Sequence, residues 1–364
     1  MKSIKITIFI SSISGGGAER VICNLANELV KNFNVDILTM SQTKNVYGLN
    51  KKVNYINLLE NKDRKGFINN NIKRYVNLQK YINITDTTVY LVMLPITTIL
   101  LLHFRSIINA PIIVAERNNP SSYSIITKIL LKKYFTMADG WIFQTPQAKK
   151  WYSHINKEYS IIIPNAVNSE FIRIPYNGKK NYEIVSVGRL TTQKNFQLLL
   201  TAFSIIAKKH INYRLIIYGK GPLENILRKK SFLLGLSDRI EFRGYVDKIA
   251  EKIESASMFV LSSKFEGMPN ALIEAMALGL PCVSTACPCG GPEYLIQNNK
   301  NGILVPVNDA NKMAEAIDRV LSDDEYSKHL SKNAQMICEK LSHKKIYKKW
   351  EQYILHIVND WYGK

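Results

Sequence analysis

The stretch YEIVSVGRLTTQKNFQLLLTAFSIIAKKH, residues 182–210, contains a strand pattern, a short loop and a helix pattern in that order. Its first residues are rich in β-branched and aromatic side chains, as in strands buried inside a sheet. Residues 196–210 then carry apolar side chains at helical spacing. A strand followed at once by a helix is the first half of a βαβ unit, so this stretch predicts a parallel sheet.

The same order recurs along both halves of the 364-residue chain. Apolar runs that fit buried strands occur at 4–10, 35–40, 89–94, 112–116, 140–144, 182–190, 213–221, 239–246, 258–263, 281–285 and 302–307. Residues 161–180 interrupt the pattern with two prolines and a glycine, which is typical of a linker between domains.

This alternation predicts an α/β protein with two tandem Rossmann-like, doubly wound domains that face a cleft. We expect an N-terminal domain over 1–168, a linker over 169–180 and a C-terminal domain over 181–342. A helix over 343–364 is expected to pack back towards the N-terminal domain. In such folds ligands bind at the carboxyl ends of the strands, so the loops there are the first places to search for chemistry.

The composition excludes several classes of protein. Five cysteines, an odd and clustered set, do not form a disulfide framework and fit a reducing cytosol. Cys287-Pro-Cys289 lacks a second ligand pair at zinc spacing, so no metal site is expected. No signal-peptide pattern opens the sequence, and the most apolar window, 89–102, is too short to span a bilayer. A soluble or peripherally bound protein is expected.

The formal net charge of +20 requires an explanation. Basic and apolar residues alternate in 72–82 and 127–135, a pattern typical of helices that lie on an anionic membrane surface. A solvated basic helix face, or a Lys-rich proteome, explains the same charge without a partner. Nucleic acid is not expected, because the chain has no recognised nucleic-acid-binding module.

Three glycine-containing loops follow predicted strands. Gly15, Gly16 and Gly17 allow a ligand to approach the backbone, but Arg20 stands where a dinucleotide-binding motif needs its third glycine. Gly188 and Arg189, followed by Lys194, place two cations before a helix, which suits a diphosphate. Each loop has a simpler alternative: a tight turn in the first, two solvated cations in the second. The third loop, with Tyr245 and Val246, lines a nucleotide slot or is a plain turn.

Two glutamates, Glu266 and Glu274, stand in the stretch KFEGMPNALIEAMALGLP, residues 264–281. The first precedes a helical pattern and the second lies inside it. A carboxylate in such a loop can accept hydrogen bonds from two neighbouring hydroxyls of a sugar. The alternative is a pair of ordinary surface acids, since glutamate is common in the first turn of a helix.

Together these motifs resemble a known family. The set comprises GRL…KN (188–195), Glu266-x7-Glu274, ALGLP (277–281), GGGAER (15–20) and IPNAV (163–167). It is similar to the retaining glycosyltransferases of GT-B fold called family 4, group 1 or glycogen-synthase-like glycosyltransferases. The resemblance extends over nearly the whole chain, with the motifs in the same order.

The resemblance implies roles for individual residues. Arg189 and Lys194 would neutralise the donor diphosphate and stabilise the leaving group, Glu266 would bind hydroxyls of the donor sugar, and Glu274 would hold the ribose. The rest of the donor site would come from Gly15, Gly16, Gly17, Gly188, Tyr245, Val246, Gly267, Met268, Pro269 and Asn270. It also implies that no metal and no cofactor is needed, and the sequence has no Asp-x-Asp motif to hold a cation.

One departure from the family pattern lies at the end of the strand in 112–116. Many relatives have a histidine there, whereas this chain has Glu116, Arg117 and Asn118, which we expect on the acceptor side. The implied function is transfer of a hexose or N-acetylhexosamine from a nucleotide sugar, with UDP expected, to a growing, lipid-linked glycan. This surface-glycan assembly is expected on the cytoplasmic face of the cell membrane, where the enzyme is peripherally bound. The alternatives are a nucleotide-sugar epimerase of the same fold and a nucleic-acid-binding protein.

Overall fold

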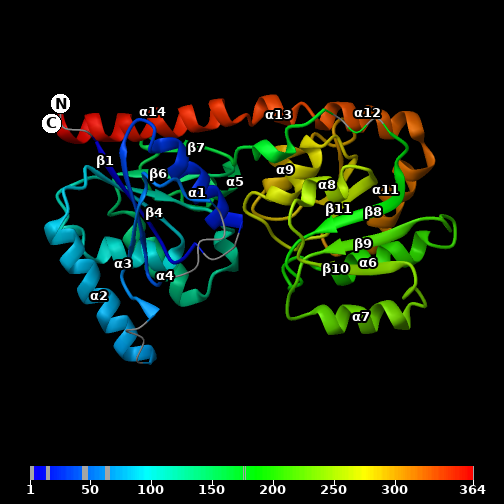
Figure 1. Ribbon diagram of the computed structural model, residues 1–364, viewed down its shortest axis with the longest axis horizontal. Helices are drawn as coiled ribbons and strands as arrows, with labels where there is room; N and C mark the ends of the chain where they lie inside the picture. The colour runs from blue at the N-terminus through cyan, green and yellow to red at the C-terminus, as the bar shows by residue number, and fades with distance from the viewer. Residues whose placement is uncertain are drawn as a thin grey trace. The chain divides into compact units, whose positions relative to one another are not determined.

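The computed structural model describes residues 4–13, 17–42, 48–61, 66–174, 176 and 178–363. The chain divides into two compact units, Met1–Ala166 with Lys344–Lys364, and Val167–His343. Each unit has its own parallel sheet with helices around it (Figure 1). The predicted class, two doubly wound α/β domains, is therefore confirmed.

The N-terminal unit contains a seven-stranded parallel sheet within the described residues, in the order β3-β2-β1-β4-β5-β6-β7. Its strands are β1 (Lys5–Ile10), β2 (Asn34–Thr39), β3 (Asn54–Asn57), β4 (Val89–Met93), β5 (Ile112–Ala115), β6 (Gly140–Phe143) and β7 (Ser160–Ile162). Its helical segments are α1 (Gly17–Leu29), α2 (Phe67–Ile84), α3 (Pro95–His103), η2 (Arg105–Ile107), η3 (Pro120–Ser122), α4 (Ile125–Phe135) and α5 (Pro146–Trp151). The sequence pattern did not predict the short strands at the two edges, β3 and β7.

The second unit contains a six-stranded parallel sheet in the order β10-β9-β8-β11-β12-β13, again within the described residues. Its strands are β8 (Asn181–Val187), β9 (Arg214–Tyr218), β10 (Ile240–Gly244), β11 (Ala256–Leu261), β12 (Cys282–Thr285) and β13 (Ile303–Val305). Its helical segments are η4 (Ser169–Phe171), α6 (Phe196–Ile206), α7 (Glu224–Leu233), α8 (Ile249–Ile253), α9 (Asn270–Ala277), α10 (Gly291–Leu295), α11 (Ala310–Ser322), α12 (Asp324–Ala334) and α13 (Ile337–Lys340).

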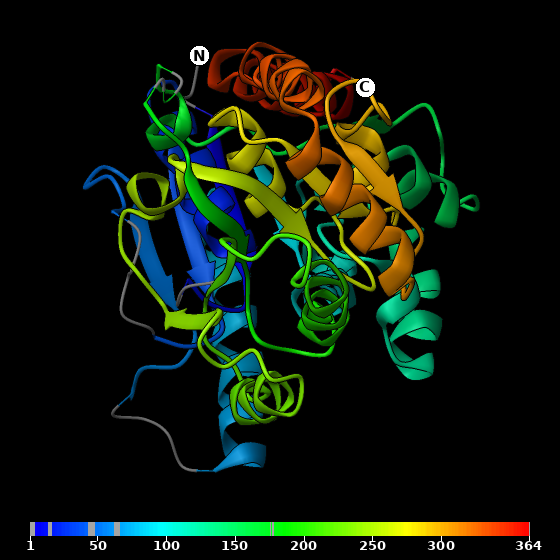
Figure 2. The same cartoon turned by 90° about the vertical axis from the view of Figure 1, so that its right-hand side faces the viewer.

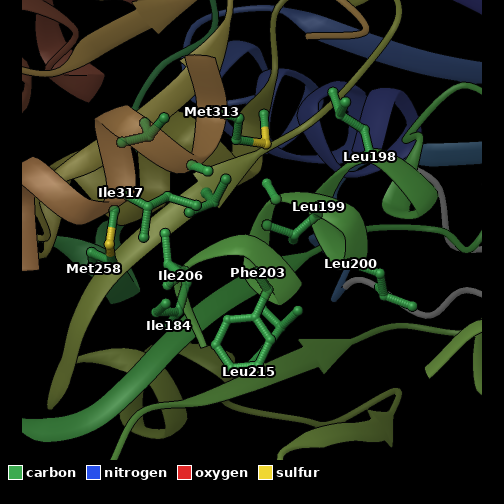
Figure 3. Close-up of a cluster of buried hydrophobic side chains, with 14 of the residues drawn as sticks. Ile184, Leu198, Leu199, Leu200, Phe203, Ile206, Leu215, Met258, Met313 and Ile317 are labelled. Carbon is green, nitrogen blue, oxygen red and sulfur yellow. The ribbon is translucent and has the colours of Figure 1, made fainter. Parts of the chain in front are cut away.

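The core of the second unit lies between α6, α11 and the sheet (Figure 3). Phe203 and Leu199 of α6 are fully buried there, together with Leu215 of β9 and Ile317 of α11. Close-packed side chains of this kind resist displacement. The core therefore fixes the start of α6 and the loop that joins it to β8.

The last helix, α14 (His343–Tyr362), belongs to the N-terminal unit from Lys344 onward (Figures 1 and 2). Its Trp350 is buried, and the Tyr353 hydroxyl accepts a hydrogen bond from the Trp141 backbone N–H at 2.8 Å. The segment expected as a linker, 169–180, groups with the second unit, where Lys180 Nζ donates to the Glu254 carbonyl at 2.7 Å. The division between the units thus follows Ala166.

Candidate active site

Two loops of the second unit come together because their strands are neighbours. β8 pairs with β11 in parallel, so the loops that follow them leave the same edge of the sheet. The first loop contains Gly188, Arg189 and Lys194, and the second contains Glu266 and Gly267. Residues that are far apart in the sequence are thereby brought within hydrogen-bond distance.

Lys194 and Glu266 form an ion pair at this edge. Lys194 Nζ lies 2.5 Å from Glu266 Oε1, and the side chains are 17% and 7% exposed. The Ser263 hydroxyl donates to the same oxygen at 2.6 Å. A charge pair this far from water holds each partner in place, since either one alone would be left uncompensated.

The second oxygen of Glu266 is less engaged. Within the described residues, Oε2 accepts only one long hydrogen bond, from Gln193 Nε2 at 3.5 Å. This oxygen can therefore accept a hydrogen bond from a ligand hydroxyl while Oε1 stays paired with Lys194.

The backbone around Glu266 is fixed on both sides. Its N–H donates to the Pro288 carbonyl at 2.6 Å, and its own carbonyl accepts from the Cys289 N–H at 2.7 Å. A Cβ at Gly291 would lie 2.0 Å from the Gly267 carbonyl oxygen, so the two chain segments touch where only glycine fits. The carboxylate is therefore carried by a loop that is hydrogen-bonded at its base.

Cys287 and Cys289 lie in the segment that is hydrogen-bonded to the Glu266 backbone. Both are buried, and burial raises the pKa of the Cys287 thiol to about 12. A thiol in that state is a poor nucleophile and a poor metal ligand. In the described part of the chain, no three His, Cys, Asp or Glu side chains are placed to hold a metal ion.

The loop after β8 is backed by the loop after β9. The Gly188 N–H donates to the Tyr218 carbonyl at 2.9 Å, and the Leu190 N–H to the Lys220 carbonyl at 3.0 Å. Gly219 has φ +130°, and a Cβ there would lie 2.0 Å from the Gly188 carbonyl oxygen. This close approach leaves room for no side chain at position 219 and sets the position of Arg189.

Arg189 and Lys194 therefore differ in their surroundings. Lys194 is half-buried and paired, whereas Arg189 is exposed and its guanidinium has no side-chain partner among the residues that the structure describes. A guanidinium without a side-chain partner and a half-buried ammonium on the same loop are two cations that can bind a diphosphate.

Glu274 lies in α9, one turn after the helix begins at Asn270. It is 6% exposed, and Glu266 is 5% exposed, so neither is a solvated surface acid. Met268 and Pro269 are buried in the connecting segment, and Pro269 is the N-cap residue of α9 without a side-chain cap. The Leu272 and Ile273 N–H groups donate to the Pro269 carbonyl at 3.1 and 3.2 Å, so the start of α9 is held by backbone hydrogen bonds.

The remaining predicted donor residues lie in different settings. Tyr245 and Val246 follow β10, and Tyr245 is 63% exposed. Gly17 is the exposed first residue of α1. Gly15 and Gly16 fall outside the described residues.

The predicted acceptor-side residues follow β5 in the N-terminal unit. Glu116 is buried and accepts four hydrogen bonds: from the Tyr123 hydroxyl at 2.6 Å, the Tyr152 hydroxyl at 2.7 Å, and the backbone N–H groups of Arg117 and Asn118 at 3.0 Å. Burial raises the pKa of this carboxyl, although the four donors oppose the shift. Glu116 therefore ties the strand end to its surroundings rather than presenting a free carboxylate.

Arg117 is also buried. Its Nη2 donates to Asn165 Oδ1, and its guanidinium lies over the Trp350 ring at 5.9 Å. Nε and Nη1 have no hydrogen-bond partner among the described residues, and burial lowers the pKa of Arg117 to about 10. Asn118 is partly exposed. Sequence reasoning missed the partners Tyr123, Tyr152 and Asn165, because none of them follows β5 directly.

Comparison with known proteins finds one family model that matches part of the chain and relatives that align over most of it. Residues 168–336 match the family model described as "Glycosyl transferases group 1". The chain is 26% identical, over 98% of its length and 99% of the relative, to a Campylobacter jejuni protein named GalNAc-alpha-(1->4)-GalNAc-alpha-(1->3)-diNAcBac-PP-undecaprenol alpha-1,4-N-acetyl-D-galactosaminyltransferase. A second protein of that organism, N-acetylgalactosamine-N,N'-diacetylbacillosaminyl-diphospho-undecaprenol 4-alpha-N-acetylgalactosaminyltransferase, is 27% identical over 96% of this chain and 99% of its own.

Solved structures share the fold. Sucrose-phosphate synthase from Thermosynechococcus elongatus superposes with a TM-score of 0.83 at 20% identity, covering 97% of this chain and 99% of the other. TarM of S. aureus, solved with UDP, superposes with a TM-score of 0.81 at 16% identity, covering 98% of this chain and all of that one (100%). At these identities the likeness concerns the fold alone.

Proposed function

We propose that this chain is a group 1 glycosyltransferase with the GT-B fold, which moves a hexose or an N-acetylhexosamine from a UDP-sugar to a growing, polyprenyl-linked glycan with retention of configuration. Two relatives that align over nearly their full length are named for acceptors linked to undecaprenol through a diphosphate. Solved neighbours of the same fold carry UDP. Both observations support a UDP-sugar donor and a lipid-linked acceptor.

The observation that carries the proposal is the Lys194–Glu266 ion pair, with the exposed Arg189 on the same loop as Lys194. As the bond between the sugar and the diphosphate breaks, negative charge grows on the departing UDP, and fixed cations at that point lower the barrier. Arg189 and Lys194 take this role without a metal or cofactor. Glu266 holds the sugar through Oε2, and Glu274 holds the ribose hydroxyls.

An assay with and without acceptor tests this function. The enzyme is mixed with a UDP-sugar and a polyprenyl-diphosphate glycan, and both UDP release and product mass are followed. Transfer predicts UDP release that depends on acceptor and a glycan longer by one sugar. Conversion of the donor sugar in the absence of acceptor identifies an epimerase instead.

The same proposal includes peripheral binding to the cytoplasmic face of an anionic membrane. Exposed apolar side chains occur on two helices of the N-terminal unit: Phe67, Ile68 and Ile72 on α2, and Ile125, Ile126 and Ile129 on α4. Both helices also carry lysines, and α2 extends away from its sheet in both views (Figures 1 and 2). None of the helices in the described ranges has the length and apolarity that crossing a bilayer requires.

Flotation with liposomes tests the membrane part. Anionic vesicles should carry the protein at low salt and release it as salt screens the lysines, whereas neutral vesicles should carry little. Ile126→Asp with Ile129→Asp should abolish flotation without loss of UDP binding. Failure of the wild-type protein to float with anionic vesicles at low salt contradicts membrane binding.

A further inference from the structure

A pocket of about 310 Å³ opens in the N-terminal unit between α4 and the end of α5. The side chains that matter for its chemistry are Tyr123, Lys128, Lys132, Trp151, Tyr152 and His154. No Asp or Glu is among its lining residues. The predicted donor-binding residues of the β8 and β11 loops take no part in it.

The floor of the pocket is rigid. Tyr152 stacks on Phe135 with ring centroids 4.2 Å apart and planes 10° from parallel. Its hydroxyl and that of Tyr123 both donate to the buried Glu116, the residue that follows β5. The pocket is thus built on the carboxyl end of a central strand, where α/β folds bind ligands.

The walls of the pocket are cationic. Neither Lys128 nor Lys132 forms a salt bridge within the described residues, and Lys128 Nζ lies 6.0 Å from the Trp151 ring centre. Burial and the nearby charge of Lys132 lower the pKa of His154. Two ammonium groups without acidic partners attract an anion of more than one charge.

Trp151 adds a second kind of surface. Its indole is 49% exposed and borders the pocket beside the two lysines. An exposed aromatic face provides rigid apolar contact area, with an N–H at its edge that can bind a hydroxyl. The pocket can therefore hold an anion joined to a sugar ring.

The outer side of α4 carries apolar residues next to these cations. Ile125, Ile126 and Ile129 are 76%, 72% and 65% exposed. Ile125 precedes Lys128 by three positions, and Ile129 precedes Lys132 by three, so each isoleucine is a helical neighbour of a pocket lysine. A ligand that contacts both the lysines and the isoleucines must combine an anionic group with an apolar chain.

We infer that this pocket binds the diphosphate and the first sugar of the polyprenyl-linked acceptor, with the prenyl chain leaving along the isoleucines of α4. The inference rests on the proposed function for the identity of the acceptor. Lys128 and Lys132 bind the diphosphate, and Trp151 contacts the sugar. The lysines are binding residues here and take no part in breaking the donor bond.

Binding of farnesyl diphosphate, followed by tryptophan fluorescence, tests the inference without turnover. Farnesyl diphosphate should bind at least about tenfold more tightly than inorganic diphosphate, since the prenyl chain adds apolar contact. Lys128→Ala with Lys132→Ala should weaken it at least about tenfold, because two charge-assisted contacts are lost. Lys133→Ala with Lys150→Ala removes the same charge from exposed positions outside the pocket and should leave binding unchanged.

Two results would overturn the inference. The first is an equal loss of farnesyl diphosphate affinity in both double variants, which would show unspecific charge attraction. The second is absence of saturable farnesyl diphosphate binding by the wild-type protein. A transfer assay on the same samples separates this from the proposed function. If the protein transfers sugar to a glycan but does not bind farnesyl diphosphate, the proposed function stands and the inference about the pocket is wrong. If the protein binds farnesyl diphosphate but transfers sugar to no acceptor, the inference about the pocket stands and the proposed function is contradicted.

Discussion

The Lys194 ammonium lies 2.5 Å from the Glu266 carboxylate, although 72 residues separate the two in the sequence. They meet because β8 and β11 are adjacent parallel strands whose following loops leave the same edge. This contact joins the residue expected at the diphosphate to the residue expected at the sugar. Loss of Lys194 should therefore disturb the sugar site as well as the diphosphate site.

Lys194→Met should both inactivate and destabilise the enzyme. It leaves the Glu266 charge buried without its partner, which costs about 3 kcal/mol of unfolding free energy. Urea unfolding measures the loss. Adding Glu266→Leu to Lys194→Met should restore most of the stability and none of the activity. A double variant as unstable as the single one would contradict a paired site.

Arg189→Ala should lower the activity and leave the stability almost unchanged. Its guanidinium is exposed and has no side-chain partner in the described part of the chain, so the unfolding free energy should change by less than about 0.5 kcal/mol. The kcat should fall by roughly 10²- to 10³-fold, because a fixed charge at the leaving group is lost. Steady-state assays measure this, with Lys208→Ala as an exposed-cation control. Unchanged kcat in Arg189→Ala would mean that the diphosphate lies elsewhere.

Glu266→Ala and Glu274→Ala should separate sugar binding from nucleotide binding. Glu274 lies within α9 and Glu266 in the loop before it, so we expect the two to contact different parts of the donor. Glu274→Ala should lose UDP affinity in a calorimetric titration, whereas Glu266→Ala should keep it and lose turnover. Equal loss of UDP affinity in both variants argues against this division.

Gly219→Ala should distort the loop that carries Arg189. Its φ of +130° and a Cβ 2.0 Å from the Gly188 carbonyl oxygen leave no room for a methyl group. We expect a loss of roughly 2 kcal/mol or more in unfolding free energy, and weaker UDP binding. Gly235→Ala is the matched control, because Gly235 has φ +68° and open space around it, so only about 1 kcal/mol is expected. Equal costs at both positions would show that the loop contact is unimportant.

The local pattern of apolar residues was enough to predict most strands of both sheets. The strand, loop and helix of 182–210 appear as β8, a turn and α6, since period and side-chain type act over a few residues. The edge strands β3 and β7 were missed because each is only three or four residues long and partly exposed. Edge strands carry a weaker apolar signal than central ones.

Contacts between distant segments could not be predicted in the same way. The Lys194 and Gln193 contacts to Glu266 depend on strand order, which a pattern of residues does not contain. For Glu116, the sequence showed a carboxylate at a strand end and not the two tyrosine hydroxyls that bind it. The interleaving of basic and apolar residues in 127–135 was visible in the sequence, but the pocket also needs the end of α5 beside α4, which the sequence does not show.

Transfer measured in EDTA with the natural class of acceptor tests the central claim most directly. Wild-type enzyme, a panel of UDP-sugars and a polyprenyl-diphosphate glycan should give one glycan longer by a single hexose or N-acetylhexosamine, with equimolar UDP. The product should form without metal, because Arg189 and Lys194 are expected to supply the charge, and Arg189→Ala should slow its formation by roughly 10²- to 10³-fold. A strict requirement for a divalent cation, or donor conversion that proceeds without acceptor, would contradict the account.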